Sequence, residues 1–395
     1  MVFKFKTVVM FLYYSILLFV TCIVATVYLV PKIISVVQYK RLMDKPNQRS
    51  SHYIATPSLG GIAFYIVFVI SLSFNNYYDD FNVSMSILPG MTILFFLGLK
   101  DDLVVFSPRT KLLGLVVACM FVLVNESFAF NNLHGFLGVY DIPLWLGILG
   151  GLFLMLGIIN SFNLIDGIDG LAASIAIVTL TFFAIIFAVL GFRFSFLSSI
   201  SMIGIMIGFL FFNLSKSKKI FMGDTGSMQV GFIIAVMTMR VMTASEGQLK
   251  HLPFDSSYNP IVLIALLIVP LYDAGRVFTL RILKGKSPFS ADRDHFHHLL
   301  IDAFKISHWK ASLVIATFNI FFLGIILLIL REFSIGAVCV VILVFLVLMT
   351  IYSVKLKKRI VSNLENKESK APKIKIFESE SPSFRFEQQE TSVVK

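Results

Sequence analysis

Long apolar runs recur along this chain, and they decide its fold class. A hydrocarbon core about 30 Å thick needs roughly 20 apolar residues for each helical crossing. With 57% of its 395 residues hydrophobic, the chain carries more apolar sequence than one soluble core can bury. We expect an all-α polytopic integral membrane protein with about eleven transmembrane helices. The runs lie at approximately 7–31, 59–75, 84–98, 111–128, 143–160, 170–190, 194–213, 226–243, 259–280, 311–330 and 333–354.

The runs also predict how the chain is divided. The first one is longer than the apolar part of a signal peptide and no small-residue cleavage pattern follows it, which favours a retained helix. We expect residues 1–354 to form one transmembrane domain that holds any catalytic site. Residues 355–395 are polar and mixed in charge, which is typical of a flexible tail.

The Lys and Arg residues predict the orientation in the membrane. Of the 34 in the chain, 27 lie in the loops after odd-numbered runs or in the tail, and four lie at the N-terminus or in the other loops. Because cytoplasmic loops are enriched in Lys and Arg, we expect the N-terminus outside and the C-terminus in the cytoplasm. The same asymmetry accounts for the net charge of +11, so we expect membrane lipid and no nucleic acid as a partner.

Five polar clusters interrupt the apolar pattern, and all five lie in loops predicted to be cytoplasmic. The first contains Asn47, Arg49 and His52 between a proline and a glycine pair, and an ordinary helix connection remains an alternative for it. The second contains Asp101, Asp102 and, ten residues after the first of them, Lys111. Two adjacent carboxylates at a membrane boundary are costly unless a cation compensates them, whereas a solvated helix end is the simpler alternative.

The third cluster is the most specific string in the chain. It reads N-x-x-N-x-x-D-G-x-D-G-L, with Asn160, Asn163, Asp166 and Asp169 as its polar members, and its loop contains no Lys or Arg. A metal ion or a cation from outside the loop is therefore implied. An EF-hand is excluded because the longer oxygen series that ends in Glu is absent.

The last two clusters add a possible metal ligand and imidazoles. Asp224 lies in the string Gly-Asp-Thr-Gly-Ser at the start of an apolar run, where it could bind a metal or cap the helix. Arg293, His295, His297 and His298 lie in the longest predicted cytoplasmic loop. No Cys or second His pair completes a zinc site, so donors to a diphosphate are the better interpretation.

Taken together, these strings resemble the polyprenyl-phosphate N-acetylhexosamine-1-phosphate transferases of glycosyltransferase family 4, which act in cell-wall and O-antigen or lipopolysaccharide synthesis in bacteria. The strings that match, in the order of the family, are DKPNQRSSHYIATPSLGG, GLKDDLVVFSPRTKLLG, NSFNLIDGIDGL, FMGDTGS, PLYDAGRVFTLR and SADRDHFHH. Phe296 stands where the family usually has isoleucine, which is a conservative departure. The form of the third string and the eleventh run resemble the GlcNAc branch more than the muramoyl-pentapeptide branch.

The resemblance implies a Mg²⁺-dependent enzyme of the bacterial cytoplasmic membrane, with Mn²⁺ as a possible substitute. Its active site would face the cytoplasm, where it would transfer N-acetylhexosamine-1-phosphate from a UDP-sugar to undecaprenyl phosphate, release UMP and start a lipid-linked glycan. A homodimer is implied as well. The catalytic residues would be Asp101, Asp102, His297 and His298; the metal ligands Asp224, Asp102 and Asn163; and the substrate-binding residues Asn47, Arg49, His52, Lys111, Asn160, Asn163, Asp166, Asp169, Arg293 and His295.

Two alternatives to this hypothesis stay open on the residues alone. An ion-coupled transporter would also need membrane carboxylates, but they should be spread along several helices near the midplane. Here nearly all lie at one interface, with Asp273 as the main exception, and we expect Asp273 to pair with Arg276 one turn later. A scaffold with an inactive site is the second alternative, yet no carboxylate of the motifs is replaced.

Overall fold

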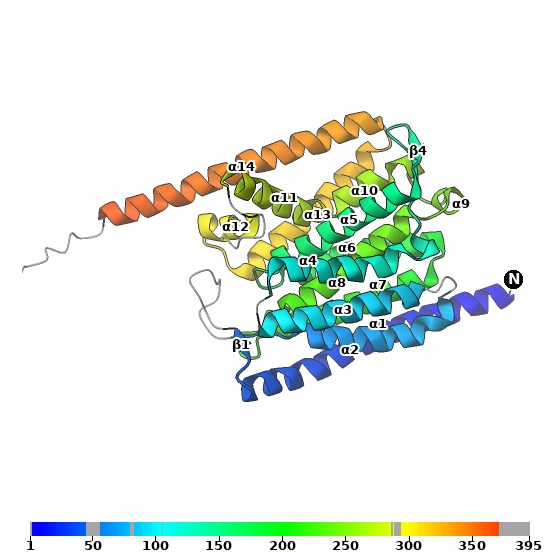
Figure 1. Cartoon of the computed structure of the whole chain (residues 1–395), viewed down its shortest axis with the longest axis horizontal. Coiled ribbons are helices and arrows are strands. Elements are labelled where there is room, and N and C mark those ends of the chain that lie inside the picture. The colour runs from blue at the N-terminus through cyan, green and yellow to red at the C-terminus, as the bar shows by residue number, and fades with distance from the viewer. Residues whose placement is uncertain are drawn as a thin grey trace, which may run out of the picture.

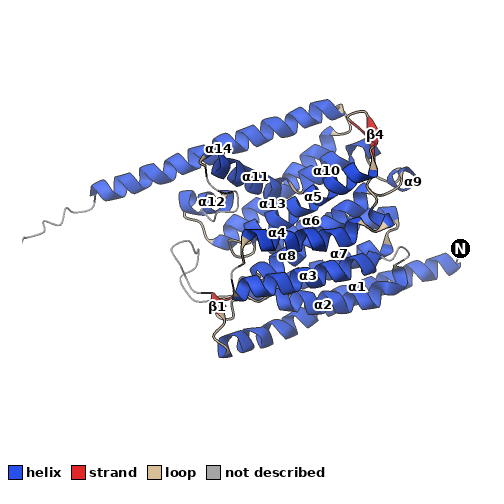
Figure 2. Ribbon diagram, in the orientation of Figure 1, coloured by secondary structure: helices blue, strands red, loops and turns tan. Residues whose placement is uncertain are grey.

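The computed structural model of this protein is a bundle of long helices that lie roughly side by side (Figure 1). It describes residues 2–44, 56–79, 83–104, 106–285, 287 and 294–370. Helices dominate, and strands occur only as two short pairs within these residues (Figure 2). The expected all-α polytopic fold is confirmed.

The helices follow the predicted apolar runs closely. They are α1 (Val2–Tyr39), α2 (Gly61–Asn75), α3 (Val83–Leu103), α4 (Pro108–Leu123), α5 (Leu144–Ile165), α6 (Leu171–Leu190), α7 (Arg193–Asn213), α8 (Gly223–Met242), α9 (Glu246–Leu249), α10 (Asn259–Leu266), α11 (Ile268–Leu283), α12 (Phe296–Phe304), α13 (His308–Ile329) and α14 (Ile335–Lys370). The strands are β1 (Met43–Asp44), β2 (Thr56–Pro57), β3 (Asn132–Phe136) and β4 (Val139–Asp141). Strand β1 pairs with β2 and β3 pairs with β4, and both pairs are antiparallel.

The described chain contains nine helices that are long and apolar enough to cross a membrane, or ten if a bent pair counts as one span. The bent pair is α10 and α11, which turn by 67° at a break where one span was predicted for 259–280. At the break, the side chain of Asn319 donates a hydrogen bond of 3.0 Å to the carbonyl of Leu266. Helix α4 covers another predicted span but has only 16 residues. The count of eleven and the direction of the chain therefore stay predictions.

Helix α8 is the centre of the bundle, because every residue of its apolar stretch is buried inside the protein. It packs against α2, α3 and α5 through small residues. A methyl group added at Gly61 would lie 2.2 Å from the backbone nitrogen of Gly226, and one at Gly98 would lie 2.5 Å from the Cα of Thr225. Glycine at these positions lets the backbones of α2 and α3 approach α8 closely.

The two ends of the bundle differ. One end carries the N-terminus, the β3–β4 hairpin and α9, and the other carries β1 and the short helix α12 (Figure 1). At the second end, β1 and β2 pair Met43 with Pro57, so the ends of the 45–55 segment lie together. Helix α14 lies along the outside of the bundle and continues to Lys370, into the segment predicted as a tail. The predicted site residues that the structure describes fall at the end with β1 and α12, as described next.

Candidate functional site

Asp102 caps the N-terminus of α8. Its carboxylate accepts hydrogen bonds from the backbone nitrogens of Asp224 (2.8 Å) and Thr225 (3.0 Å) and from the hydroxyl of Thr225 (2.5 Å). The first backbone N–H groups of a helix have no partner within the helix, and a carboxylate there also meets the positive end of the helix dipole. The sequence raised a capping role for Asp224, but the cap comes from α3, 122 residues earlier.

Lys111 lies between two carboxylates. Its ammonium group donates to Oδ2 of Asp101 at 2.9 Å and also to Oδ2 of Asp224. Asp101 is fixed in addition by the backbone nitrogen of Phe106, at 2.6 Å from Oδ1. The second and fourth clusters of the sequence therefore form one charged network at the junction of α3, α4 and α8.

The third cluster joins this network through Asn163. Its side-chain nitrogen donates to Oδ1 of Asp224 (2.7 Å) and to the hydroxyl of Ser227 (2.9 Å), and this leaves the carbonyl oxygen of Asn163 available for a ligand. Asn160, one turn earlier, donates to the carbonyl of Leu156 within its own helix.

Asp166 is the acid of the site that most needs a cation. Burial raises the pKa of its carboxyl group well above the usual value, and the carboxylates of Asp224, Asp102 and Asp169 raise it further. Within the described residues, no hydrogen bond contributes to this shift. A carboxylate with like charges around it is stabilised when a cation binds beside it.

Asp169, the other acid of this loop, already has two partners, a lysine and a histidine. Lys219 Nζ lies 2.7 Å from its Oδ2, and His308 Nδ1 lies 3.3 Å from the same oxygen. Burial alone would raise the pKa of Asp169, but the hydrogen bonds and charges of His308 and Lys219 outweigh it and the net shift is downward. The expected cation from outside the loop is thus found for Asp169.

The histidine segment is held by Asp273 of α11. The Oδ1 of Asp273 accepts the backbone N–H of Phe296 at 2.7 Å, and its Oδ2 lies 3.3 Å from the Nδ1 atoms of His295 and His297. The expected pair with Arg276 is confirmed at 3.2 Å. Sequence reasoning missed that Asp273 orients the histidines, because no local signal indicates a contact across more than 20 residues.

The imidazoles reach the loop of the third cluster. A methyl group added at Gly167 would lie 2.7 Å from Nε2 of His297 and 3.2 Å from Nε2 of His298. His297 is 1% exposed, and its Nε2 has no hydrogen-bond partner within the described part of the chain. Burial lowers the pKa of His297, and although Asp273 opposes the shift, its net direction is downward. The second, third, fourth and fifth clusters therefore meet at one end of the bundle.

The first cluster is represented only by its flanks. Asn47, Arg49 and His52 lie outside the described residues, as does Arg293 of the fifth cluster. The flank after them packs on the fourth cluster, because Phe221 N donates to the carbonyl of Pro57 at 2.7 Å and Gly60 N donates to the carbonyl of Phe221 at 3.0 Å. Gly223 completes this contact with a φ of +70°, and a methyl group there would meet Ser58 O at 1.9 Å.

The donor set suits a magnesium ion that is shared with a phosphate ligand. No group of three His, Cys, Asp or Glu side chains within the described ranges is arranged to enclose a metal on its own. Mg²⁺ is commonly held by one or two carboxylates and completes its shell with substrate phosphates and water. Asp224 and Asp166 are the carboxylates that could serve in this way, and the carbonyl of Asn163 could add a neutral oxygen.

The fold and this site define a class: a polytopic membrane protein with a carboxylate, lysine and histidine centre at one end of the bundle. A sequence model described as glycosyl transferase family 4 matches residues 84–242. A probable undecaprenyl-phosphate N-acetylglucosaminyl 1-phosphate transferase of Bacillus subtilis (strain 168) is 33% identical over 276 residues, which cover 69% of this chain and 73% of that protein. The undecaprenyl-phosphate alpha-N-acetylglucosaminyl 1-phosphate transferase of Escherichia coli O157:H7 is 29% identical, with coverages of 66% and 70%. The chain belongs to glycosyl transferase family 4, and it is a glycosyl-1-phosphate transferase.

Proposed function

We propose that this enzyme transfers N-acetylglucosamine-1-phosphate from UDP-GlcNAc, or a close UDP-N-acetylhexosamine, to undecaprenyl phosphate at the cytoplasmic face of a bacterial inner membrane. The names of the two relatives reported above describe a transfer of this kind. The observation that carries the proposal is the junction of Asp101, Lys111 and Asp224, together with Asp166, whose carboxyl group has a pKa that burial and the neighbouring carboxylates raise.

In the proposed reaction, an oxygen of the lipid phosphate attacks the sugar-linked phosphorus of the UDP-sugar. A new P–O bond forms, the bond to the bridging oxygen breaks, and UMP leaves with the electron pair of that bond. A lipid phosphate is already largely ionised at neutral pH, since the second pKa of a phosphoester is about 6. No strong base is required, and Asp101 is at most an assisting base.

The protein's own groups would position the phosphates and offset their charge. Lys111 offers an ammonium group that can turn from Asp224 to a phosphate oxygen. His297 and His298 present Nε2 atoms at Gly167, beside the acidic loop, where they can donate to the departing phosphate.

Magnesium, when bound, would supply a Lewis acid for the transferred phosphoryl group. We assign Asp224 and Asp166 as its carboxylate ligands and the carbonyl of Asn163 as a third contact. Asp102 stays a predicted ligand, but three hydrogen bonds already engage its carboxylate, which makes it the weaker candidate.

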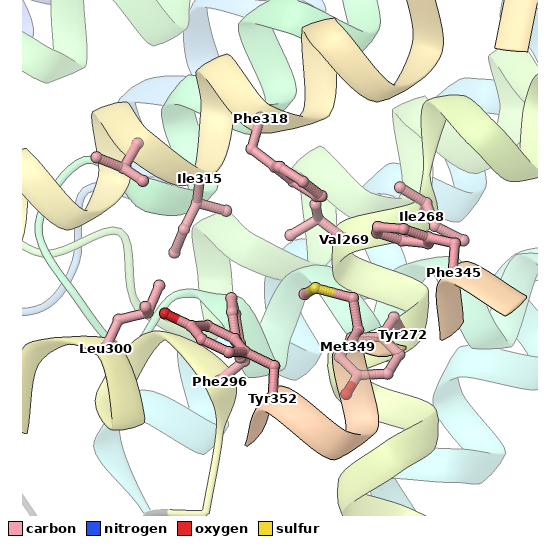
Figure 3. A pocket seen from close by; sticks show the side chains of 11 residues that line it. Ile268, Val269, Tyr272, Phe296, Leu300, Ile315, Phe318, Phe345, Met349 and Tyr352 are labelled. Carbon is pink, nitrogen blue, oxygen red and sulfur yellow. The ribbon is translucent and has the colours of Figure 1, made fainter. Parts of the chain in front are cut away.

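An apolar cavity next to the histidine helix suits part of the prenyl chain of the acceptor. It lies between α11, α12, α13 and α14, and its wall includes Tyr272, Phe296, Phe318, Met349 and Tyr352 (Figure 3). Its volume of about 190 Å³ is below that of a typical ligand pocket, so it would accept one section of a long chain. Phe296 connects the two places, because its neighbours in the sequence are His295 and His297.

Purified protein in nanodiscs tests the donor. UDP-GlcNAc, other UDP-N-acetylhexosamines and UDP-MurNAc-pentapeptide are each supplied with undecaprenyl phosphate, with Mg²⁺, with Mn²⁺ or with chelator. We expect UMP release and a lipid product of the mass of GlcNAc-diphosphate-undecaprenol, lost with chelator and partly restored by Mn²⁺. Turnover of the pentapeptide donor alone would move the enzyme to the other branch, and ion transport without UMP release would contradict the proposal.

Labelling tests the membrane side. Single cysteines at Ser107, Ser217 and Ser287, each in a loop predicted to be cytoplasmic, should react only with reagents that reach the cytoplasm. Reaction of any of them from outside intact cells would overturn the orientation. The homodimer also stays a prediction, and cross-linking in native membranes tests it.

A further inference from the structure

The loop between α5 and α6, residues 166–170, is bound by side chains from other parts of the fold. Gly170 N donates to Oδ1 of Asn213 at 2.7 Å, and Asn213 in turn donates to the carbonyl of Ile220 at 2.9 Å. Asn213 is 4% exposed. This contact fixes the end of the loop to the segment that leads into α8.

Asp169 fixes the middle of the loop through two separate groups. Its backbone carbonyl accepts the hydroxyl of Ser312 at 2.7 Å, and its carboxylate pairs with Lys219 and His308. Ser312 and His308 lie one turn apart on α13, and Lys219 lies before α8. A loop without basic residues is thus tied to α13 by an imidazole and a hydroxyl, and to the segment before α8 by a lysine.

The position of Asp169 decides where its neighbours lie. Asp166 is three residues earlier, with Asp224 and Asp102 near enough to raise its pKa, and Gly167 lies against the imidazoles of His297 and His298. A movement of the loop by about 1 Å would change both contacts, and misplacement of that size can cost about 100-fold in rate.

We propose that His308, Ser312 and Lys219 are positioning residues of the transferase: through Asp169 they hold the 166–170 loop so that Asp166 and Gly167 face the reacting phosphates. The inference rests on the proposed function. None of the three contacts Asp224, Asp166 or the histidine segment in the described structure, so their effect on the reaction must pass through the loop.

The variants are His308→Ala and Ser312→Ala, with His308→Asn as the conservative replacement that keeps an N–H donor. His251→Ala is the matched control, since this exposed histidine follows α9 at the opposite end of the bundle. Two measurements are made on the full chain in nanodiscs: amide hydrogen exchange of a peptide that contains Gly170, and the Mg²⁺ and substrate dependence of UMP release.

We expect His308→Ala and Ser312→Ala to speed exchange in that peptide and to raise the Mg²⁺ concentration for half-maximal rate about ten-fold. The KM for undecaprenyl phosphate should stay unchanged, His308→Asn should recover much of both effects, and His251→Ala should show neither. A general loss of stability would instead change every peptide and every kinetic constant.

Unchanged exchange would overturn the anchoring, and faster exchange with wild-type kinetics would overturn the link to the reaction. If the wild-type protein releases no UMP with any donor, the proposed function fails and the link fails with it. In that case, faster amide exchange in the variants would still show that the three residues anchor the loop, and only the assignment of the reaction would be wrong.

Discussion

Helices α8 and α14 are both apolar enough to cross a membrane, but they have different surroundings. Every residue in the apolar stretch of α8 is buried by protein, compared with 11% in α14. Helix α8 includes Gln229, Thr238 and Arg240, whereas α14 presents Val340, Leu343 and Val347 outward. Polar groups at membrane depth are tolerated where protein supplies partners, as Gly61 and Thr225 do with their carbonyls for Gln229. The contrast teaches that a spanning helix can contain polar residues where other helices cover it, and needs an apolar surface where they do not.

The largest effects should come from the N-terminal end of α8. We expect Asp224→Asn to reduce UMP release by about 100-fold or more in a protein that still folds, because it removes charge from the proposed metal ligand but keeps its shape, and Lys111 retains its pair with Asp101. Asp102→Asn should lower both activity and unfolding temperature, since one amide oxygen cannot serve the three donors that two carboxylate oxygens accept. Leaving a buried donor unpaired costs about 1–3 kcal/mol.

Both variants are measured in one detergent, by UMP release and by thermal unfolding. Wild-type activity of Asp224→Asn at low millimolar Mg²⁺ would show that Asp224 is not a ligand. An unchanged unfolding temperature for Asp102→Asn would show that the cap does not stabilise α8.

For this end of the molecule, the sequence predicts which residues gather there better than it predicts which of them are in contact. The clusters with Asp101, Asn163 and Asp224 were each found from local strings, and the shared predicted side indicated that they meet. What was missing were contacts between distant segments: Asp102 with α8, and Asp169 with His308. Such pairs depend on how helices pack, and helix packing leaves no periodic signal in one sequence. The bend between α10 and α11 was not predicted for the same reason. Asn319, which donates a hydrogen bond at the break, lies 53 residues away from Leu266 in the sequence.

A change in stability of intermediate size should distinguish the close packing around α8 from the open surface of α14. Gly61→Ala places a methyl group 2.2 Å from the backbone of Gly226, and overpacking of this kind costs about 1–3 kcal/mol. Gly336→Ala in α14 meets nothing within 4 Å, so alanine there should be neutral or stabilising by up to about 1 kcal/mol. Thermal unfolding of the two variants side by side is the measurement, and equal midpoints would contradict the close approach at α8.

The smallest effect should come from the C-terminal part of α14. Lys357 Nζ lies 2.5 Å from Oδ1 of Asp294, and Lys284 Nζ lies 3.1 Å from Oδ2. These pairs are partly exposed, so Asp294→Asn should cost at most about 1 kcal/mol. Burial alone would raise the pKa of Asp294, but the two lysines outweigh it and lower the pKa.

A lowered pKa gives a stabilising contribution above the unfolded value of about 3.9 that disappears as pH falls through the folded value. The stability difference between wild type and Asp294→Asn should therefore be present at pH 7 and vanish in acid below roughly pH 4. Asp302→Asn, an exposed acid on α12, is the control and should show no such difference. A difference that grows in acid would have the wrong sign for this ion pair.

The ammonium of Lys111 between Asp101 and Asp224 has a consequence for how the protein is made and handled. Many metal sites form only when the ion arrives, because bare carboxylates repel one another and the chain does not close without it. Here a covalently attached cation already occupies the gap between two of the acids. A newly inserted chain can then complete this end of its bundle before it meets any divalent ion, and the protein should survive extraction into chelator and regain its activity when the ion is returned.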